Sequence, residues 1–162
     1  MDIRLRDKLY IQPLSDRSIK KLLKYFVAKG TQKDKQEVYF YAGSVYRDLQ
    51  DTPRALENFF NSVNVFNENP GCDSVMQQKA YGNLNALFYD VQNYKNALLM
   101  AEKECGIAQE MNNLKSYSVI HVGAAQIHVN DTLAAIKSFE RALTMAQKES
   151  GRVKMEAYYP IL

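Results

Sequence analysis

Three segments of this chain repeat one pattern of apolar, small and aromatic residues, and this repetition limits the possible folds most strongly. Each copy predicts two helices joined by a short turn, with small residues where the two helices meet. A single pair of such helices cannot bury its apolar faces, so neighbouring copies must stack. The three copies run through Tyr39, Ala42, Gly43, Tyr46, Ala55, Phe59 and Ser62, then Tyr81, Leu84, Asn85, Phe88, Ala97, Ala101 and Glu104, then Val119, Val122, Gly123, Gln126, Ala135, Phe139 and Ala142.

The distances between the paired alanines give the period of the repeat. Ala55 and Ala97 are 42 residues apart, and Ala97 and Ala135 are 38 apart. Short polar turns separate the expected helices, and no segment alternates apolar and polar residues for long enough to predict a sheet. We expect helices over the ranges 2–11, 16–29, 34–49, 53–68, 74–90, 94–111, 114–129, 132–149 and 152–160.

The pattern resembles the tetratricopeptide repeat (TPR), in a long-repeat variant similar to those of bacterial sensor and regulator proteins. The resemblance implies an all-α fold, a right-handed superhelix (solenoid) of antiparallel helix pairs, in one TPR-like domain over 1–162. We expect this chain to be a piece of a longer protein, with the alternative that 152–162 folds back as a cap. The expected copies are a partial repeat at 1–30, full repeats at 36–73, 78–113 and 116–149, and a partial repeat at 151–162.

Glycines at two matching positions predict a close approach of the paired helices. Gly43 and Gly123 lack the Cβ atom that would hold the helices apart, and this contact must offset the helix cost of glycine, about 1 kcal/mol. Asn85 stands at the matching position of the middle copy, and Ala101 stands where the other two copies have a phenylalanine. These two departures make the middle repeat different from its neighbours.

The composition and motifs exclude several classes of function. The net charge of +3 results from 21 basic and 18 acidic residues, and we expect no nucleic-acid binding from so even a balance. A local cluster of Arg17, Lys20, Lys21 and Lys24 predicts a solvated helix face.

No apolar stretch approaches 18 residues, so we expect no membrane insertion. The sequence has no HExxH, GxSxG, GxxxxGK[ST] or CxxC motif, and we expect no enzyme activity and no cofactor.

Two histidines and two cysteines are the remaining candidates for metal or redox chemistry. His121 and His128 are seven residues apart, about 10.5 Å along a helix, which is too far for both to bind one metal ion. We therefore predict no metal site. Cys72 and Cys105 do not form a disulfide framework, although pairing between them stays open, as does the cellular compartment.

The resemblance also implies where a partner protein would bind. In TPR arrays the first helix of each pair lines the concave groove, and the expected anchors are Phe40, Tyr89 and Tyr117. Arg47 is expected to pair with an acidic residue of the partner. Phe40 and Ser44 replace the lysine and asparagine with which some TPR proteins clamp a chaperone's terminal carboxylate, so we do not expect that ligand. The full predicted groove set is Phe40, Ser44, Arg47 and Asp48, then Asn83, Ala86, Tyr89 and Asp90, then Tyr117, Ile120, His121, Ala124, Ile127 and His128.

The expected function is a module that binds a protein or a peptide, as the scaffold or sensor part of a bacterial regulatory protein. Two alternatives stay open: self-association through the terminal helices into a homo-oligomer, and nucleic-acid binding by a helical repeat. The groove residues could also be merely solvated, or neighbouring repeats of the same protein could fill the groove. An enzyme is the least favoured class.

Overall fold

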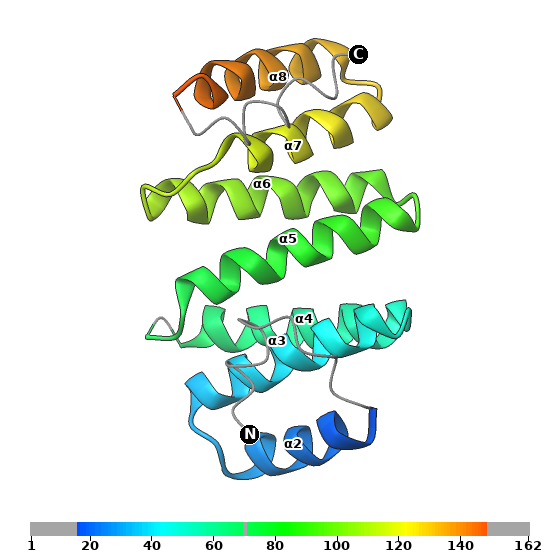
Figure 1. The fold of residues 1–162 in the computed structure, drawn as a ribbon, viewed down its shortest axis with the longest axis vertical. Helices are drawn as coiled ribbons and strands as arrows, with labels where there is room; N and C mark the ends of the chain where they lie inside the picture. Colours follow the sequence, from blue (N-terminus) through cyan, green and yellow to red (C-terminus); the bar gives the residue numbers. More distant parts are fainter. Residues whose placement is uncertain (1–15, 70, 149–162) are drawn as a thin grey trace. The chain divides into compact units, whose positions relative to one another are not determined.

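The computed structural model describes residues 16–69 and 71–148, and both segments are built of α-helices without a strand (Figure 1). The prediction of an all-α fold is thus confirmed. The predicted helices at 2–11 and 152–160 lie outside the described residues. The helices are α2 Asp16–Lys29, α3 Gln32–Asp48, α4 Thr52–Glu68, α5 Ser74–Asp90, α6 Tyr94–Glu110, α7 Ser116–His128 and α8 Thr132–Ala146.

Three short turns between paired helices share one backbone geometry. Each turn has a non-glycine residue in the left-handed region, with φ of 57° at Gln50, 60° at Gln92 and 65° at Asn130. The next residue is the N-cap of the following helix, and its side chain accepts a hydrogen bond from a backbone N–H three residues later. The N-caps are Asp51, Asn93 and Asp131. The three turns therefore share one sequence of backbone conformation and side-chain cap.

The chain divides into two compact units, 1–80 and 81–162, and α5 begins in the first and ends in the second. In unit 1, α3 and α4 form a helix pair around the fully buried Phe59 ring, and α2 packs against α3. A Cβ atom at Gly43 would lie 2.7 Å from the Phe59 ring, so the predicted close approach is confirmed here. The Phe40 ring meets the Phe59 ring edge-on, with 5.7 Å between the centroids.

A buried glutamine connects this pair to the start of α5. The Gln36 side chain is fully buried. Its Nε2 donates to the backbone oxygen of Asp73 at 2.9 Å, and its Oε1 accepts from the Asp73 backbone N–H at 2.8 Å. The Asp73 carboxylate in turn accepts from the backbone N–H groups of Val75 and Met76. The side-chain amide of Gln36 thus holds in place Asp73, the residue that caps the start of α5.

In unit 2, α7 and α8 form a second helix pair, and α6 packs against α7. A Cβ atom at Gly123 would lie 2.7 Å from the Phe139 ring, as at Gly43 in unit 1. Asn85 replaces that glycine in the middle copy, and its Nδ2 donates to the backbone oxygen of Ala97 at 2.9 Å. The larger side chain therefore fits by making a hydrogen bond between α5 and α6.

Candidate partner-binding face

Ten of the predicted groove residues lie on the parts of α5 and α7 that belong to unit 2. On α7 their spacing follows successive helical turns, which places them along one side of the helix. We call this set the α5–α7 face. It consists of Asn83, Ala86, Tyr89 and Asp90 on α5, and of Tyr117, Ile120, His121, Ala124, Ile127 and His128 on α7.

An aromatic cluster connects the two helices of this face. The Tyr89 hydroxyl and His128 Nε2 are 2.7 Å apart and share a hydrogen bond. The ring of Tyr94, the first residue of α6, stacks on the His128 ring with 4.0 Å between centroids and 10° between planes. Tyr89 meets both rings edge-on. Two predicted groove residues are therefore in direct contact, whereas Tyr94 was not predicted because its position belongs to a second helix.

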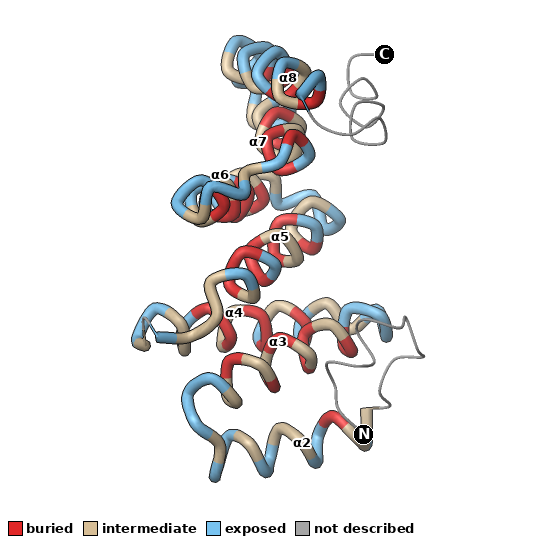
Figure 2. The backbone as a smooth tube through the Cα atoms, turned by 60° about the vertical axis from the view of Figure 1, so that its left-hand side comes forward, coloured by how far each residue is buried: buried red, intermediate tan, exposed pale blue. Residues whose placement is uncertain are grey.

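The helix α7 carries no Asp, Glu, Lys or Arg side chain, although one side of it faces solvent. Its inner side is buried through Val119, Gly123 and Ala125. On its outer side Tyr117 is 37% exposed and Ile127 is 47% exposed. In Figure 2, buried red segments accordingly alternate with tan, partly exposed ones along α7. This side of the helix is a solvent-facing surface without fixed charge.

A buried carboxylate lies beneath the same face. Glu104 on α6 is only 4% exposed, and its Oε1 accepts a hydrogen bond of 2.8 Å from the Ser118 hydroxyl on α7. Its Oε2 lies 3.7 Å from Nδ1 of His121, and these two atoms are buried without a hydrogen bond. Because Nδ1 is buried while the side chain is 44% exposed, the Nε2 edge of the ring faces outward.

The space for this carboxylate comes from a glycine on α5. The Glu104 carboxyl carbon lies 3.3 Å from where a Cβ atom of Gly82 would be. The other two copies have Phe40 and Ile120 in place of Gly82, and have Ser62 and Ala142 in place of Glu104. In the middle copy the small residue is therefore on the first helix and the large one on the second, the reverse of the other two copies. Sequence reasoning missed this pair, although a glycine replacing bulky residues opposite a glutamate was a visible signal.

The remaining predicted groove residues belong to unit 1, and one of them is not available to a partner. Phe40 was expected as an anchor, but it is only 5% exposed because its ring packs on Phe59. That expectation is corrected. Ser44 donates its hydroxyl to the backbone oxygen of Phe40 at 3.1 Å. Arg47 and Asp48 are exposed, and Nη2 of Arg47 lies 2.7 Å from the Asp48 carboxylate, so an acidic partner residue would compete with Asp48.

Both cysteines are free thiols, and Cys105 lies beside Glu104 on α6. Burial raises the pKa of the Cys105 thiol to about 12, the negative charge of Glu104 adds to the effect, and Arg141 opposes it. Burial also raises the pKa of Cys72. A thiol of such high pKa is protonated at neutral pH and is a poor nucleophile.

We predict that iodoacetamide alkylates Cys105 on the order of 50-fold more slowly in the folded protein than in the urea-unfolded chain at pH 8. The thiolate population falls about 1000-fold, and the greater nucleophilicity of a more basic thiolate restores part of the rate. Mass spectrometry of the labelled peptides measures both cysteines, and the Cys105 rate should keep rising with pH well above 9. Equal rates in the folded and unfolded chains would contradict the raised pKa of the partly buried Cys105 thiol.

Within the described ranges, no three or more His, Cys, Asp or Glu side chains are grouped so that they could hold a metal ion. In the same part of the chain, each helix is too short or too polar to span a bilayer.

Comparison with known proteins shows similarity in the fold. No family model and no curated protein matches the sequence. The fold is similar to that in the crystal structure of BtubC (BKLC) from P. vanneervenii, with a TM-score of 0.71 and 20% sequence identity. The similarity covers 82% of this chain and 56% of that chain. The present chain thus spans little more than half of the protein it resembles, and the similarity concerns the fold.

Proposed function

We propose that this chain is a TPR-like interaction module that binds a peptide segment of a partner protein on the α5–α7 face. The observation that carries the proposal is the uncharged outer side of α7, where Tyr117 and Ile127 remain accessible to solvent. Aromatic and aliphatic side chains of this kind are typical anchors at protein interfaces. In this proposal the module acts as a scaffold or sensor of a bacterial regulatory protein, and the attached parts read out the binding.

The neighbouring contacts hold side chains of the α5–α7 face in place for a partner. The Tyr89–His128 hydrogen bond and the stacked Tyr94 ring support one end of the face, so this end is rigid before a partner arrives. Preorganised side chains reduce the entropy lost on binding. At the other end, Tyr117 lies edge-on to His121 with 5.9 Å between ring centroids. His121 and His128 provide polar contacts along the α7 side of the face.

The proposal is tested by placing a photo-crosslinking amino acid at Tyr117 in cells that make the protein and identifying the attached peptide. A matched probe at Leu99 controls for general surface contact, because Leu99 is 45% exposed and lies on α6 outside the face. The peptide is then synthesised and its affinity measured. We expect Tyr117→Ala to weaken binding by about 2 kcal/mol, roughly 30-fold, and Leu99→Ala to leave binding unchanged.

Three results would contradict this function. The Leu99 probe could capture the same peptides as the Tyr117 probe, or Tyr117→Ala could bind the peptide as tightly as the original chain. A captured peptide from a second copy of this chain would indicate self-association instead. Light scattering of the purified protein would then show a mass above that of the 18.6 kDa monomer.

A further inference from the structure

One short segment of unit 1 has a higher net positive charge than the entire chain. The segment 16–35, which covers α2 and the start of α3, has seven basic and two acidic residues, a net charge of +5. The entire chain has a net charge of +3, so the remaining residues are together slightly acidic. Such asymmetry indicates an electrostatic contact surface rather than a general property of the protein.

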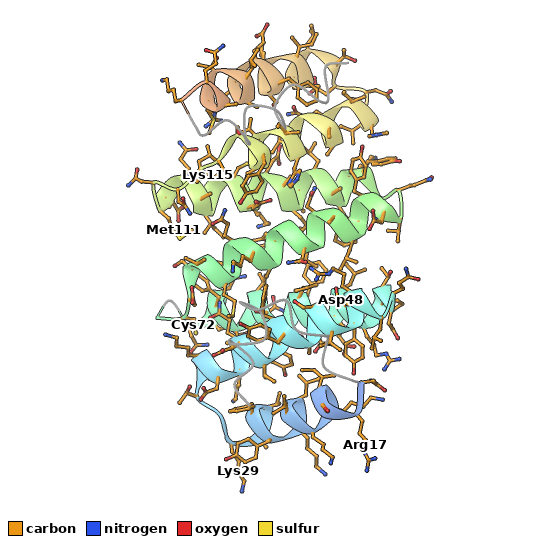
Figure 3. The ribbon with its side chains drawn as sticks, in the orientation of Figure 1. Arg17, Lys29, Asp48, Cys72, Met111 and Lys115 are labelled. Carbon is orange, nitrogen blue, oxygen red and sulfur yellow. The ribbon has the colours of Figure 1, made fainter. Side chains whose placement is uncertain are left out.

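Four of these cations form a continuous basic face on α2, made of Arg17, Lys20, Lys21 and Lys24. Their spacing places them on one side of the helix, within about 10.5 Å along its axis. All four are exposed. Ile19, on the opposite side of the helix, is fully buried in unit 1. Figure 3 shows the labelled Arg17 at one end of α2, with its side chain projecting away from α3.

The charge of this basic face is only partly neutralised by its surroundings. The Asp16 carboxylate lies 2.8 Å from Lys20 Nζ and 3.3 Å from Arg54 Nη1, so it is shared between two cations. Within residues 16–69 and 71–148, no carboxylate forms an ion pair with Arg17, Lys21 or Lys24. Among the residues that the structure describes, these three charges are therefore not neutralised by an ion pair.

Apolar side chains border the basic face on both sides. Tyr25 is 59% exposed and Val27 is 39% exposed, and on a helical projection they lie on either side of the four cations. Tyrosine and the aliphatic stems of lysine are suited to the boundary between water and lipid, where an apolar body and a polar tip are both accommodated. The face thus combines positive charge with shallow apolar contacts.

We propose that the basic face of α2 attaches this protein to membrane surfaces that contain anionic lipids. Lysine is a compact charge that suits the diffuse negative potential of a lipid surface, whereas lysine is depleted at protein–protein interfaces. A single-stranded nucleic acid would favour a longer groove with several stacking aromatic rings, whereas within α2 only Tyr25 has an exposed aromatic ring, and it lies edge-on to Phe26. The attachment is peripheral, because the apolar side of α2 stays packed against α3. This inference concerns unit 1 and does not depend on the peptide-binding proposal for unit 2.

The test is sedimentation of the full chain with two kinds of vesicle, phosphatidylcholine alone and phosphatidylcholine mixed with phosphatidylserine. We expect binding to the mixed vesicles only, and release when salt rises from about 0.1 M to about 1 M, since the screening length falls from about 10 Å to about 3 Å. The variant Arg17→Gln/Lys21→Gln/Lys24→Gln should bind about 100-fold more weakly, at about fivefold for each cation removed. Tyr25→Ser should weaken binding further in either background.

The matched control is Lys95→Gln/Lys137→Gln/Lys148→Gln, which removes the same charge from exposed positions outside α2. It should bind like the original chain, and circular dichroism should show that both triple variants are folded. Equal losses in the two variants, equal binding to both kinds of vesicle, or no binding to either would overturn the proposal. So would binding to polyuridylate or polyglutamate at a salt concentration at which the mixed vesicles are not bound.

Discussion

Replacing Phe59 by alanine should lower the free energy of unfolding of this protein by about 3–5 kcal/mol. Phe59 is fully buried between α3 and α4, and its ring is bordered by the backbone at Gly43 and by the ring of Phe40. The loss combines the transfer of a large apolar side chain out of the core with the cost of the cavity left behind. Gly43 offers no side chain that could move into this cavity.

The neighbouring Phe60→Ala is the matched control, because Phe60 is only partly buried on the same helix. Phe60→Ala should lower the free energy of unfolding clearly less than Phe59→Ala does. Urea-induced unfolding followed by circular dichroism measures both variants, and the midpoint of Phe59→Ala should lie well below that of Phe60→Ala. Equal midpoints would show that Phe59 does not hold the α3–α4 pair together.

The second large effect is expected from adding a single methyl group where the paired helices meet. Gly43→Ala and Gly123→Ala should each destabilise the protein, although alanine is the better helix former by about 1 kcal/mol. The new Cβ atoms would lie 2.7 Å from the Phe59 and Phe139 rings, and overpacking of this kind typically costs about 1–3 kcal/mol. Both rings are too enclosed to move aside freely.

Gly106→Ala is the matched control, since Gly106 lies inside α6 and no atom is within 4 Å of the position of its missing Cβ. It should raise the free energy of unfolding by about 1 kcal/mol. Gly43→Ala should also cost less in a Phe59→Leu background, because the obstructing ring is gone. If Gly43→Ala, Gly123→Ala and Gly106→Ala all stabilised the protein alike, the close approach of the helices would be refuted.

The helices of this protein were predictable because sequence spacing and turn chemistry agree along the chain. The limits of α2 and α5 match those predicted, and the other described helices differ from prediction by one to three residues at their ends. At α7 the helix begins two residues later than predicted, because Lys115 has an extended backbone. Gly43 and Gly123 were identified because they stand at matching positions of two copies, where a close contact between helices can offset the helix cost of glycine.

The candidate site was less predictable, because exposure depends on tertiary packing. Phe40 occupies a groove position in the repeat pattern, yet its ring turns toward Phe59 and fills the core. Tyr94 stacks on His128 in the aromatic cluster. It was not predicted, because the predicted groove positions come only from the first helix of each pair and Tyr94 lies on a second helix. Glu104 appeared in the sequence only as one position of the second copy, and its burial was not predicted, because its partners Gly82 and Ser118 come from two other helices.

The buried carboxylate of Glu104 has a consequence for the order in which the repeats can be joined. Its hydrogen-bond donor, Ser118, is replaced by Val38 and Ala80 at the matching positions of the other two copies. Neither residue has a side chain that can donate to a carboxylate, and an unsatisfied buried charge is costly. A copy of the first repeat, or of the middle repeat itself, placed after the middle repeat would leave Glu104 without this hydrogen bond, and we expect it to be less stable there than the third repeat. In this chain a single glutamate, Glu104, thus favours one order of the repeats over the others.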